Sequence, residues 1–348
     1  MADFSGRPKP CGRTAPPRAV VGMPIPRRWL VLVLSVVSAV SAGGCGPSRA
    51  PGLDDAGTSD AGGPEAPGAD ADADAASEAT DATSVVQRGP LWKLLLPAAT
   101  YETRVQAATS TDIEAVAASY GADGYVITAA LATEAQSTSY ELFGEREIAA
   151  TATFDTRVVL ASFADLDAKA TALAADGFAL TAVTKTFAGL TLFGVRPTGD
   201  ARTYVSKTLL VTGPSLDPAV FSLGSEGFVV TAMSWSGTGY RLFGVREAGS
   251  TAVLDAKVIE LDGSDFSTMV TAEAARGYVV TSAIANSSTY VLAVARPAGT
   301  ATPRAIRVKG AIGAQLEGEA AAFGAAGMII QTVAAAESVF TLFGSSAD

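Results

Sequence analysis

Apolar positions along residues 101–348 recur with a period of about 50 residues. Each period contains a glycine followed by a large side chain: Gly124-Tyr125, Gly177-Phe178, Gly227-Phe228, Gly277-Tyr278 and Gly327-Met328. A second string, Leu-Phe-Gly, occurs at 142–144, 192–194, 242–244 and 342–344, with Leu292-Ala293-Val294 in the fourth period. Copies in the same register indicate that one supersecondary unit is repeated in tandem.

An amphipathic helix is predicted before each glycine, because apolar residues there follow a period of about 3.6 residues. The apolar stripes are Ile113, Ala117, Tyr120; Leu166, Ala170, Leu173; Leu216, Val220, Leu223; Phe266, Val270, Ala274; and Leu316, Ala320, Phe323. The expected N-cap positions are Asp112, Asp165, Ser215, Asp265 and Gln315. The glycine is expected at the C′ position, where a positive φ ends the helix.

Two β-rich segments joined by a polar tip follow each glycine, and this pattern predicts a hairpin. In the second unit these strands are Phe178–Thr184 and Leu190–Arg196, and another strand, Thr156–Ala161, precedes the helix. Side chains alternate between the faces of a strand. Leu180 and Ala182 are therefore both expected to pack on the unit's own helix.

Both faces of each predicted sheet are apolar, since Leu192 lies on one face and Phe193 on the other. The helix covers one face, so neighbouring units must cover the second. We therefore predict an α+β fold of five tandem β-α-β-β units, stacked or closed into a ring. The repeat domain is residues 89–348, with units at 101–150, 151–200, 201–250, 251–300 and 301–348.

The second unit contains Leu173-Ala174-Ala175-Asp176-Gly177-Phe178-Ala179-Leu180-Thr181 and ends in Leu192-Phe193-Gly194-Val195-Arg196-Pro197. These motifs resemble those of a small single-unit bacterial family of unknown function, so the resemblance implies a fold and no activity. Five such units also resemble, by cyclic permutation, the pentein propeller. Enzymes of that fold use Cys and His, which the repeat domain lacks, so this resemblance implies the ring alone.

Residues 1–44 are predicted to be an export signal, because Arg27 and Arg28 precede the apolar run Trp29–Ala42. The run ends in Ala42-Gly43-Gly44-Cys45, which resembles a lipobox and implies lipid attachment at Cys45. The alternative is ordinary signal-peptidase cleavage after Ala42, which gives a secreted protein. Met23 is a possible true start.

Residues 45–88 are predicted to be a disordered acidic tether, rich in Ala, Asp and Gly. A lipobox followed by such a tether resembles the surface lipoproteins of myxobacteria. The resemblance implies a cell-envelope protein held by its N-terminal lipid, with the outer membrane as the expected site and a periplasmic or secreted protein as the alternative.

The chain contains no histidine, and its two cysteines, Cys11 and Cys45, precede the repeat domain. That domain therefore lacks disulfides, thiolate or imidazole metal ligands, and Ser-His or Cys-His catalysis. The net charge of −10 disfavours nucleic acid, whose binding depends on Lys and Arg. We expect no cofactor, no metal and no nucleic-acid partner.

Binding residues are expected in the hairpin tips, where the units differ from one another. The tips are Ala132–Ser139, Thr184–Gly189, Ser234–Gly239, Ala285–Thr289 and Ala334–Ser338, and their distinctive residues are Trp235, Phe187, Lys185, Glu134 and Asn286. Trp235 is the foremost candidate, since Trp is enriched at binding hot spots. The alternative is that Trp235 folds back as a local apolar plug.

Cationic residues recur in the first strand, as Arg104, Arg157, Lys207, Lys257 and Arg307, and in the last strand, as Arg146, Arg196, Arg246 and Arg296. They could form an anion site, but residues required in every unit are better explained as structural ion pairs with acids such as Glu145, Glu226 and Glu260. Glu145 and Glu147 are interpreted as a solvated strand edge rather than as a catalytic pair.

The segment Leu91-Trp92-Lys93-Leu94-Leu95-Leu96-Pro97 is too apolar for a tether and is assigned to the repeat domain. It resembles the closing strand of a unit and is expected to cap a sheet edge or to close a ring; a short segment lying on the first helix is the alternative.

The function expected from these features is a non-catalytic, surface-displayed binding or structural module for an envelope protein or polysaccharide. The alternative is a carboxylate-dependent cell-envelope enzyme acting on polysaccharide, which needs two acids about 5–10 Å apart in a cleft.

Overall fold

The structure is a computed structural model that describes Lys93 and residues 99–133, 138–186, 189–262, 266–286, 289–336 and 338–347. The predicted export signal and tether lie outside the described residues. All elements below belong to one compact unit of the chain.

Each period forms a strand, a helix and a hairpin, as the apolar pattern predicts. The first unit contains β1 (Tyr101–Thr109), α1 (Ile113–Ala122), β2 (Val126–Ala132) and β3 (Ser139–Glu147). The second contains β4 (Phe154–Ala161), α2 (Leu166–Ala175), β5 (Ala179–Thr186) and β6 (Gly189–Pro197). The third contains β7 (Tyr204–Val211), α3 (Leu216–Ser225), β8 (Val229–Trp235) and β9 (Tyr240–Glu247). The fourth contains β10 (Leu254–Asp262), α4 (Phe266–Ala274), β11 (Val279–Asn286) and β12 (Thr289–Pro297), and the fifth β13 (Arg304–Ile312), α5 (Leu316–Ala325), β14 (Ile329–Ala336) and β15 (Val339–Ala347).

Each unit folds its three strands into one antiparallel sheet, with the last strand in the middle. The strand orders in the described residues are β1-β3-β2, β4-β6-β5, β7-β9-β8, β10-β12-β11 and β13-β15-β14. The strands of one sheet are therefore contiguous in sequence, and no described sheet borrows a strand from another unit.

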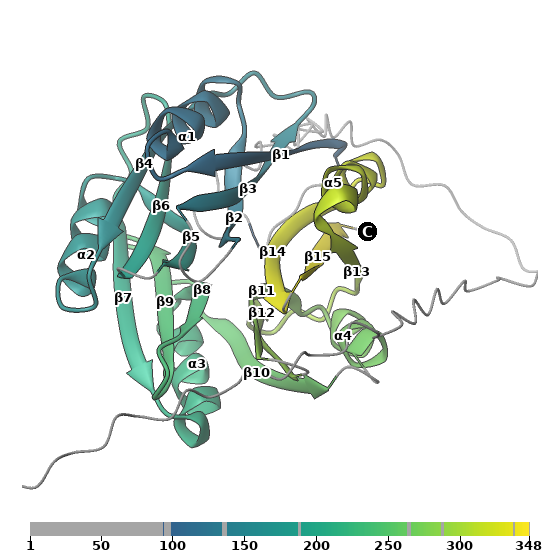
Figure 1. Cartoon of the computed structure of the whole chain (residues 1–348). Helices are drawn as coiled ribbons and strands as arrows, with labels where there is room; N and C mark the ends of the chain where they lie inside the picture. Colours follow the sequence, from purple (N-terminus) through teal and green to yellow (C-terminus); the bar gives the residue numbers. More distant parts are fainter. Residues whose placement is uncertain are drawn as a thin grey trace, which may run out of the picture. The chain divides into compact units, whose positions relative to one another are not determined.

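The five sheets contact one another in a closed series (Figure 1). The second strand of each unit, which we call the inner strand, contacts the inner strand of the next, and β14 of the fifth unit contacts β2 of the first. Each helix likewise packs on the first strand of the next unit, and α5 packs on β1. Of the two predicted arrangements, the contacts fit a ring rather than an open stack.

Neighbouring units cover the second face of each sheet, as predicted. Leu192 lies in the core beneath its own helix, whereas Phe193 is buried in the core of the first unit. Phe143 lies in the core of the fifth unit, so the same insertion also joins the last unit to the first. Each Leu-Phe-Gly string thus serves two cores.

The C′ glycines adopt the predicted conformation. Gly124, Gly177, Gly227, Gly277 and Gly327 all have positive φ, between 70° and 86°. A Cβ on Gly227 would approach the carbonyl oxygen of Ala252 to 2.3 Å, so the third helix also ends against the next unit.

The N-cap positions are correct where they are described, but the predicted capping bonds are absent there. Asp112, Asp165, Ser215 and Gln315 make no side-chain capping hydrogen bond to their helices, and Asp265 lies outside the described residues. At Asp165 ψ is 3° rather than extended, so its carboxylate does not reach the amides of the first turn. It instead accepts a hydrogen bond from Ser162 Oγ at 2.7 Å and pairs with Lys169.

Each inner strand contains a β-bulge that the alternation pattern did not predict. In β5 the register shifts between Leu180 and Ala182. Because a bulge shifts the phase of alternation by one residue, Leu180 packs beneath α2 while Ala182 packs in the core of the first unit. The expectation that both residues face the same helix is therefore wrong.

Candidate functional site

The five bulges occupy equivalent positions, four residues after each C′ glycine. The extra residues are Thr128, Thr181, Thr231, Thr281 and Gln331, and all five are buried. We call these five residues the bulge ring. A bulged residue is left out of the strand ladder, so its backbone groups are available to bind other partners.

Lys93 is bound by three members of the bulge ring. Its Nζ donates hydrogen bonds to the carbonyl oxygens of Gln331 at 3.0 Å, Thr231 at 3.2 Å and Thr281 at 3.2 Å. The side chain is 0% exposed. A protonated amine has three N–H donors, and backbone carbonyls are suitable acceptors for them.

Burial lowers the pKa of Lys93 to about 7, because removing the ammonium from water disfavours its charged form. The amine is therefore mainly charged at pH 6 and loses its proton as the pH rises above about 7. Among the described contacts, the dipoles of the three carbonyl groups stabilise the buried charge.

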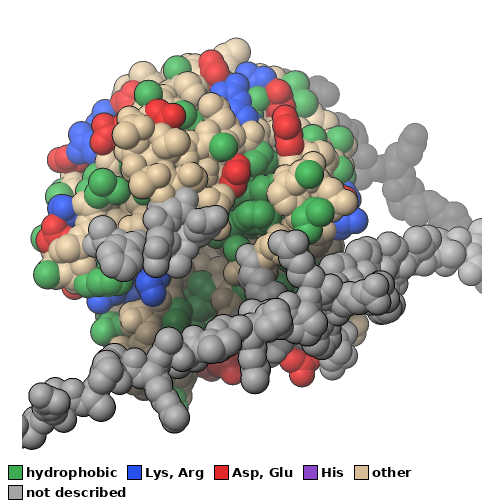
Figure 2. Space-filling model, viewed as in Figure 1, with side chains coloured by type: hydrophobic (Ala, Val, Ile, Leu, Met, Phe, Trp, Pro, Cys, Tyr) green, Lys and Arg blue, Asp and Glu red, His purple; other side chains and the backbone are tan. Residues whose placement is uncertain are grey.

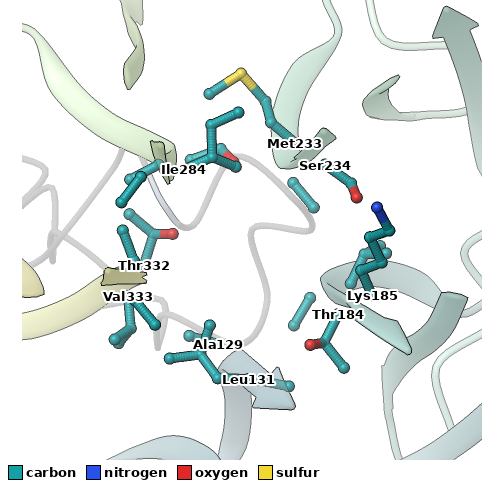
Figure 3. Close-up of a pocket in the computed structure, with 18 of the residues that line it drawn as sticks. Ala129, Leu131, Thr184, Lys185, Met233, Ser234, Ile284, Thr332 and Val333 are labelled. Atoms are coloured by element: carbon teal, nitrogen blue, oxygen red, sulfur yellow. The ribbon is translucent and has the colours of Figure 1, made fainter. Parts of the chain in front are cut away.

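An open cavity of about 310 Å³ lies between the inner strands of all five units. Figure 3 shows its labelled side chains arranged around one central space. In Figure 2 hydrophobic side chains gather in the central hollow, whereas acidic and basic side chains lie towards the periphery. Thr128 and Thr231 of the bulge ring line this axial cavity but Lys93 does not, so the two sites are adjacent and distinct.

The lining of the axial cavity is almost uncharged. Apolar groups such as Leu131, Met233 and Ile284 alternate around it with the hydroxyls of Ser234 and Thr332. Lys185 is the single ionisable side chain among its described lining residues. Such a surface can bind an uncharged ligand through apolar contacts and a few hydrogen bonds.

Two of the predicted binding residues meet at the edge of this cavity. Lys185 Nζ donates a hydrogen bond to the carbonyl oxygen of Trp235 at 3.0 Å, which links the second and third units. The Trp235 ring packs edge-on against Tyr240, with centroids 4.8 Å apart, and is still 39% exposed. Trp235 thus combines local packing with an accessible face.

The other predicted site residues do not join this cluster. Asn286 is exposed at the end of β11 and does not line the cavity. Glu134 and Phe187 lie outside the described residues, as does Cys45.

Most of the recurrent cations form structural ion pairs, although most of their partners differ from the predicted acids, and Arg246 binds the backbone carbonyl of Glu226 instead. In the second unit Arg157 and Arg196 both lie over the Phe178 ring, with Cζ at 4.4 and 4.7 Å from its centroid, and pair with Asp176 and Asp155 respectively. Two cations likewise lie over the rings of Tyr125, Phe228 and Tyr278. The last-strand arginines fasten the helix ends to the sheets, since each binds a backbone carbonyl there.

Glu145 corrects the prediction of a solvated edge. It is only 5% exposed, and accepts hydrogen bonds from Thr103 Oγ1 at 2.7 Å and from the amide of Ile330 at 3.0 Å. Burial raises the pKa of Glu145 well above its usual value, against the effect of both hydrogen bonds. Since Ile330 belongs to β14, this carboxyl joins the first unit to the fifth.

The described cavities contain no pair of acids. The axial cavity has no described carboxylate, and a second hollow between α1 and β4 has only Asp155, which pairs with Arg196. Among the described residues no cluster of Cys, Asp and Glu could hold a metal ion. Within that same part of the chain, each helix is too short or too polar to span a membrane.

The chain matches no family model, no curated protein and no solved structure. The resemblances drawn from its motifs therefore stay predictions.

Sequence reasoning missed the bulge ring and the role of Lys93. Lys93 binds three members of the bulge ring through its side chain and lies in a 3-10 turn rather than a strand, so the prediction of an edge-capping strand is wrong at this residue. A weak signal was present: four of the five residues that follow a C′ glycine by four positions are Thr. A lone Lys inside an apolar run was the second signal.

Proposed function

We propose that this chain is a non-catalytic cell-envelope binding module that holds an uncharged segment of an envelope polysaccharide in its axial cavity. The observation that carries the proposal is a cavity lined by all five units with hydroxyl and apolar groups, and with Trp235 exposed at its edge. Flat aromatic rings stack well on the apolar faces of sugars. The lack of paired carboxylates among the described lining residues favours binding over polysaccharide hydrolysis.

The binding test is calorimetric titration with neutral oligosaccharides and with acidic oligosaccharides of equal length. Neutral chains should bind, and Trp235→Ala should weaken binding by about tenfold, a loss of about 1.4 kcal/mol. Ala335→Phe should also weaken binding, because it places a ring in the cavity, whereas Leu160→Phe on the exposed side of β4 is the matched control. Equal affinity of both phenylalanine variants would place the ligand elsewhere.

We further propose that the ring is a cyclically permuted, pentein-like propeller displayed on the membrane by a lipid at Cys45, with the outer membrane as the site. The closed series of contacts supports the first part, and the run before Cys45 supports the second. Radiolabelled palmitate should label the protein and not its Cys45→Ala variant. Release of unlabelled wild-type protein would instead support the secreted alternative.

A further inference from the structure

The bulge ring has the chemistry of a site for a monovalent cation. Three of its carbonyl oxygens surround one buried cationic nitrogen at 3.0–3.2 Å. Carbonyl dipoles of this kind replace the hydration shell of K⁺ in selective sites. None of the five residues is acidic, so the ring lacks the carboxylates with which proteins usually hold Ca²⁺.

The ring also carries buried oxygen atoms that the described structure leaves without a hydrogen-bond partner. They are Thr128 Oγ1 and Gln331 Oε1, on residues that are each 1% exposed. The hydroxyls of Thr181, Thr231 and Thr281 are instead satisfied by carbonyl oxygens of the neighbouring strand. Unsatisfied buried acceptors are costly, and a bound cation or its water would satisfy them.

We propose that the bulge ring is a binding site for a monovalent cation of ammonium size, which the chain fills with its own Lys93. When the Lys93 side chain is removed, the site takes a free primary ammonium ion or K⁺. The cation site shares Thr128 and Thr231 with the lining of the axial cavity, but Lys93 does not line that cavity, so variants of Lys93 test the cation site separately.

The test compares thermal unfolding of the full chain with Lys93→Ala, Lys93→Met and Lys185→Ala at pH 6 and constant ionic strength. Lys185 is the matched control, since its Nζ also binds a backbone carbonyl but is exposed. The salts are the chlorides of Na⁺, K⁺, ethylammonium and tetramethylammonium; the last has the charge but no N–H donors.

Lys93→Ala should unfold about 5 °C below the wild type in Na⁺, because three carbonyls lose their partner. Ethylammonium or K⁺ should restore at least half of this loss in a saturable manner. Recovery with K⁺ and not with ethylammonium would indicate that the site prefers an inorganic cation. Tetramethylammonium should have no effect, nor should any salt affect Lys93→Met, whose side chain fills the space. Equal responses of all variants, or no recovery of Lys93→Ala, would overturn the proposal.

A measurement on the wild type covers the case in which Lys93→Ala does not fold. At pH 6, ¹⁵N NMR should show one ammonium signal that exchanges slowly with water and is missing in Lys93→Met. Exchange of Lys93 as fast as that of exposed Lys185 would show that the site does not hold the ammonium, and would overturn the proposal.

Discussion

The glycine of each Leu-Phe-Gly string lies directly under a helix residue. A Cβ on Gly344 would come within 2.3 Å of the Phe323 ring, whereas the nearest atoms to a Cβ on Gly244, on Leu223 and Phe228, lie at 3.2 Å. In the fourth unit the corresponding residue is Val294, and the helix residue Glu273 instead binds Lys257.

We predict that Gly344→Ala destabilises the protein by about 2–3 kcal/mol, because the buried ring must move. Gly244→Ala should cost less than Gly344→Ala, since both nearest atoms lie at 3.2 Å and need to move by only a few tenths of an ångström. Combining Gly344→Ala with Phe323→Leu should cost less than the sum of the single changes in urea unfolding. Strict additivity would mean that the ring does not limit this position.

At the scale of elements, the helix ends combine a backbone requirement with contact to the next unit. Gly227 and Gly249 both have φ near +80°, but only Gly227 has an atom close to the place a Cβ would occupy. Gly249→Ala should therefore cost about 1 kcal/mol for the left-handed conformation alone. Gly227→Ala should cost about 1–2 kcal/mol more, as measured by denaturant unfolding. Similar losses of stability for the two variants would show that the contact between the end of α3 and the fourth unit adds no constraint at Gly227.

The contact between β3 of the first unit and β14 of the fifth should be sensitive to pH through Glu145. The folded pKa of Glu145 is raised and its unfolded pKa is near 4.5, so the stability it contributes is present below 4.5 and is lost as the pH rises through the folded pKa. Glu145→Gln should remove this dependence and therefore gain stability relative to the wild type between pH 5 and 8, by at most about 1.4 kcal/mol per pH unit.

Glu226→Gln is the control for that experiment. A hydrogen bond from Lys207 lowers the pKa of Glu226, so its contribution is instead lost as the pH falls. Thermal melts of the two variants across the same pH series should show opposite trends. A common trend would attribute the effect to net charge rather than to the Glu145 site.

The sequence predicts the elements well because their signals reside in side chains. The helices, the C′ glycines and the two-sided burial of Leu192 and Phe193 all follow from periodicity. The bulges do not follow from it, since an inserted residue requires no particular side chain. Its effect is to move the alternation of the later residues by one position. The partners of Lys93 are carbonyl oxygens, which every residue has, so its site leaves almost no sequence signature.

At the scale of the whole molecule, the Phe of each string tests whether the ring is closed. Phe193 is buried in the first unit and Phe143 in the fifth. In a closed ring, Phe143→Ala should cost about 3–5 kcal/mol, as much as Phe193→Ala. In an open array, Phe143→Ala would occur at a free end and cost far less. Chemical denaturation of the two variants, with exposed Phe221→Ala as the control, distinguishes the two cases.

The position of Lys93 determines how a mechanical load would enter the domain. Tension on β1 alone would peel an edge strand from β3, breaking its hydrogen bonds one after another. Lys93 precedes β1, and its ammonium is held by strands of the third, fourth and fifth units. Tension applied to the chain on the N-terminal side of Lys93 is therefore shared among three sheets before it reaches the first unit.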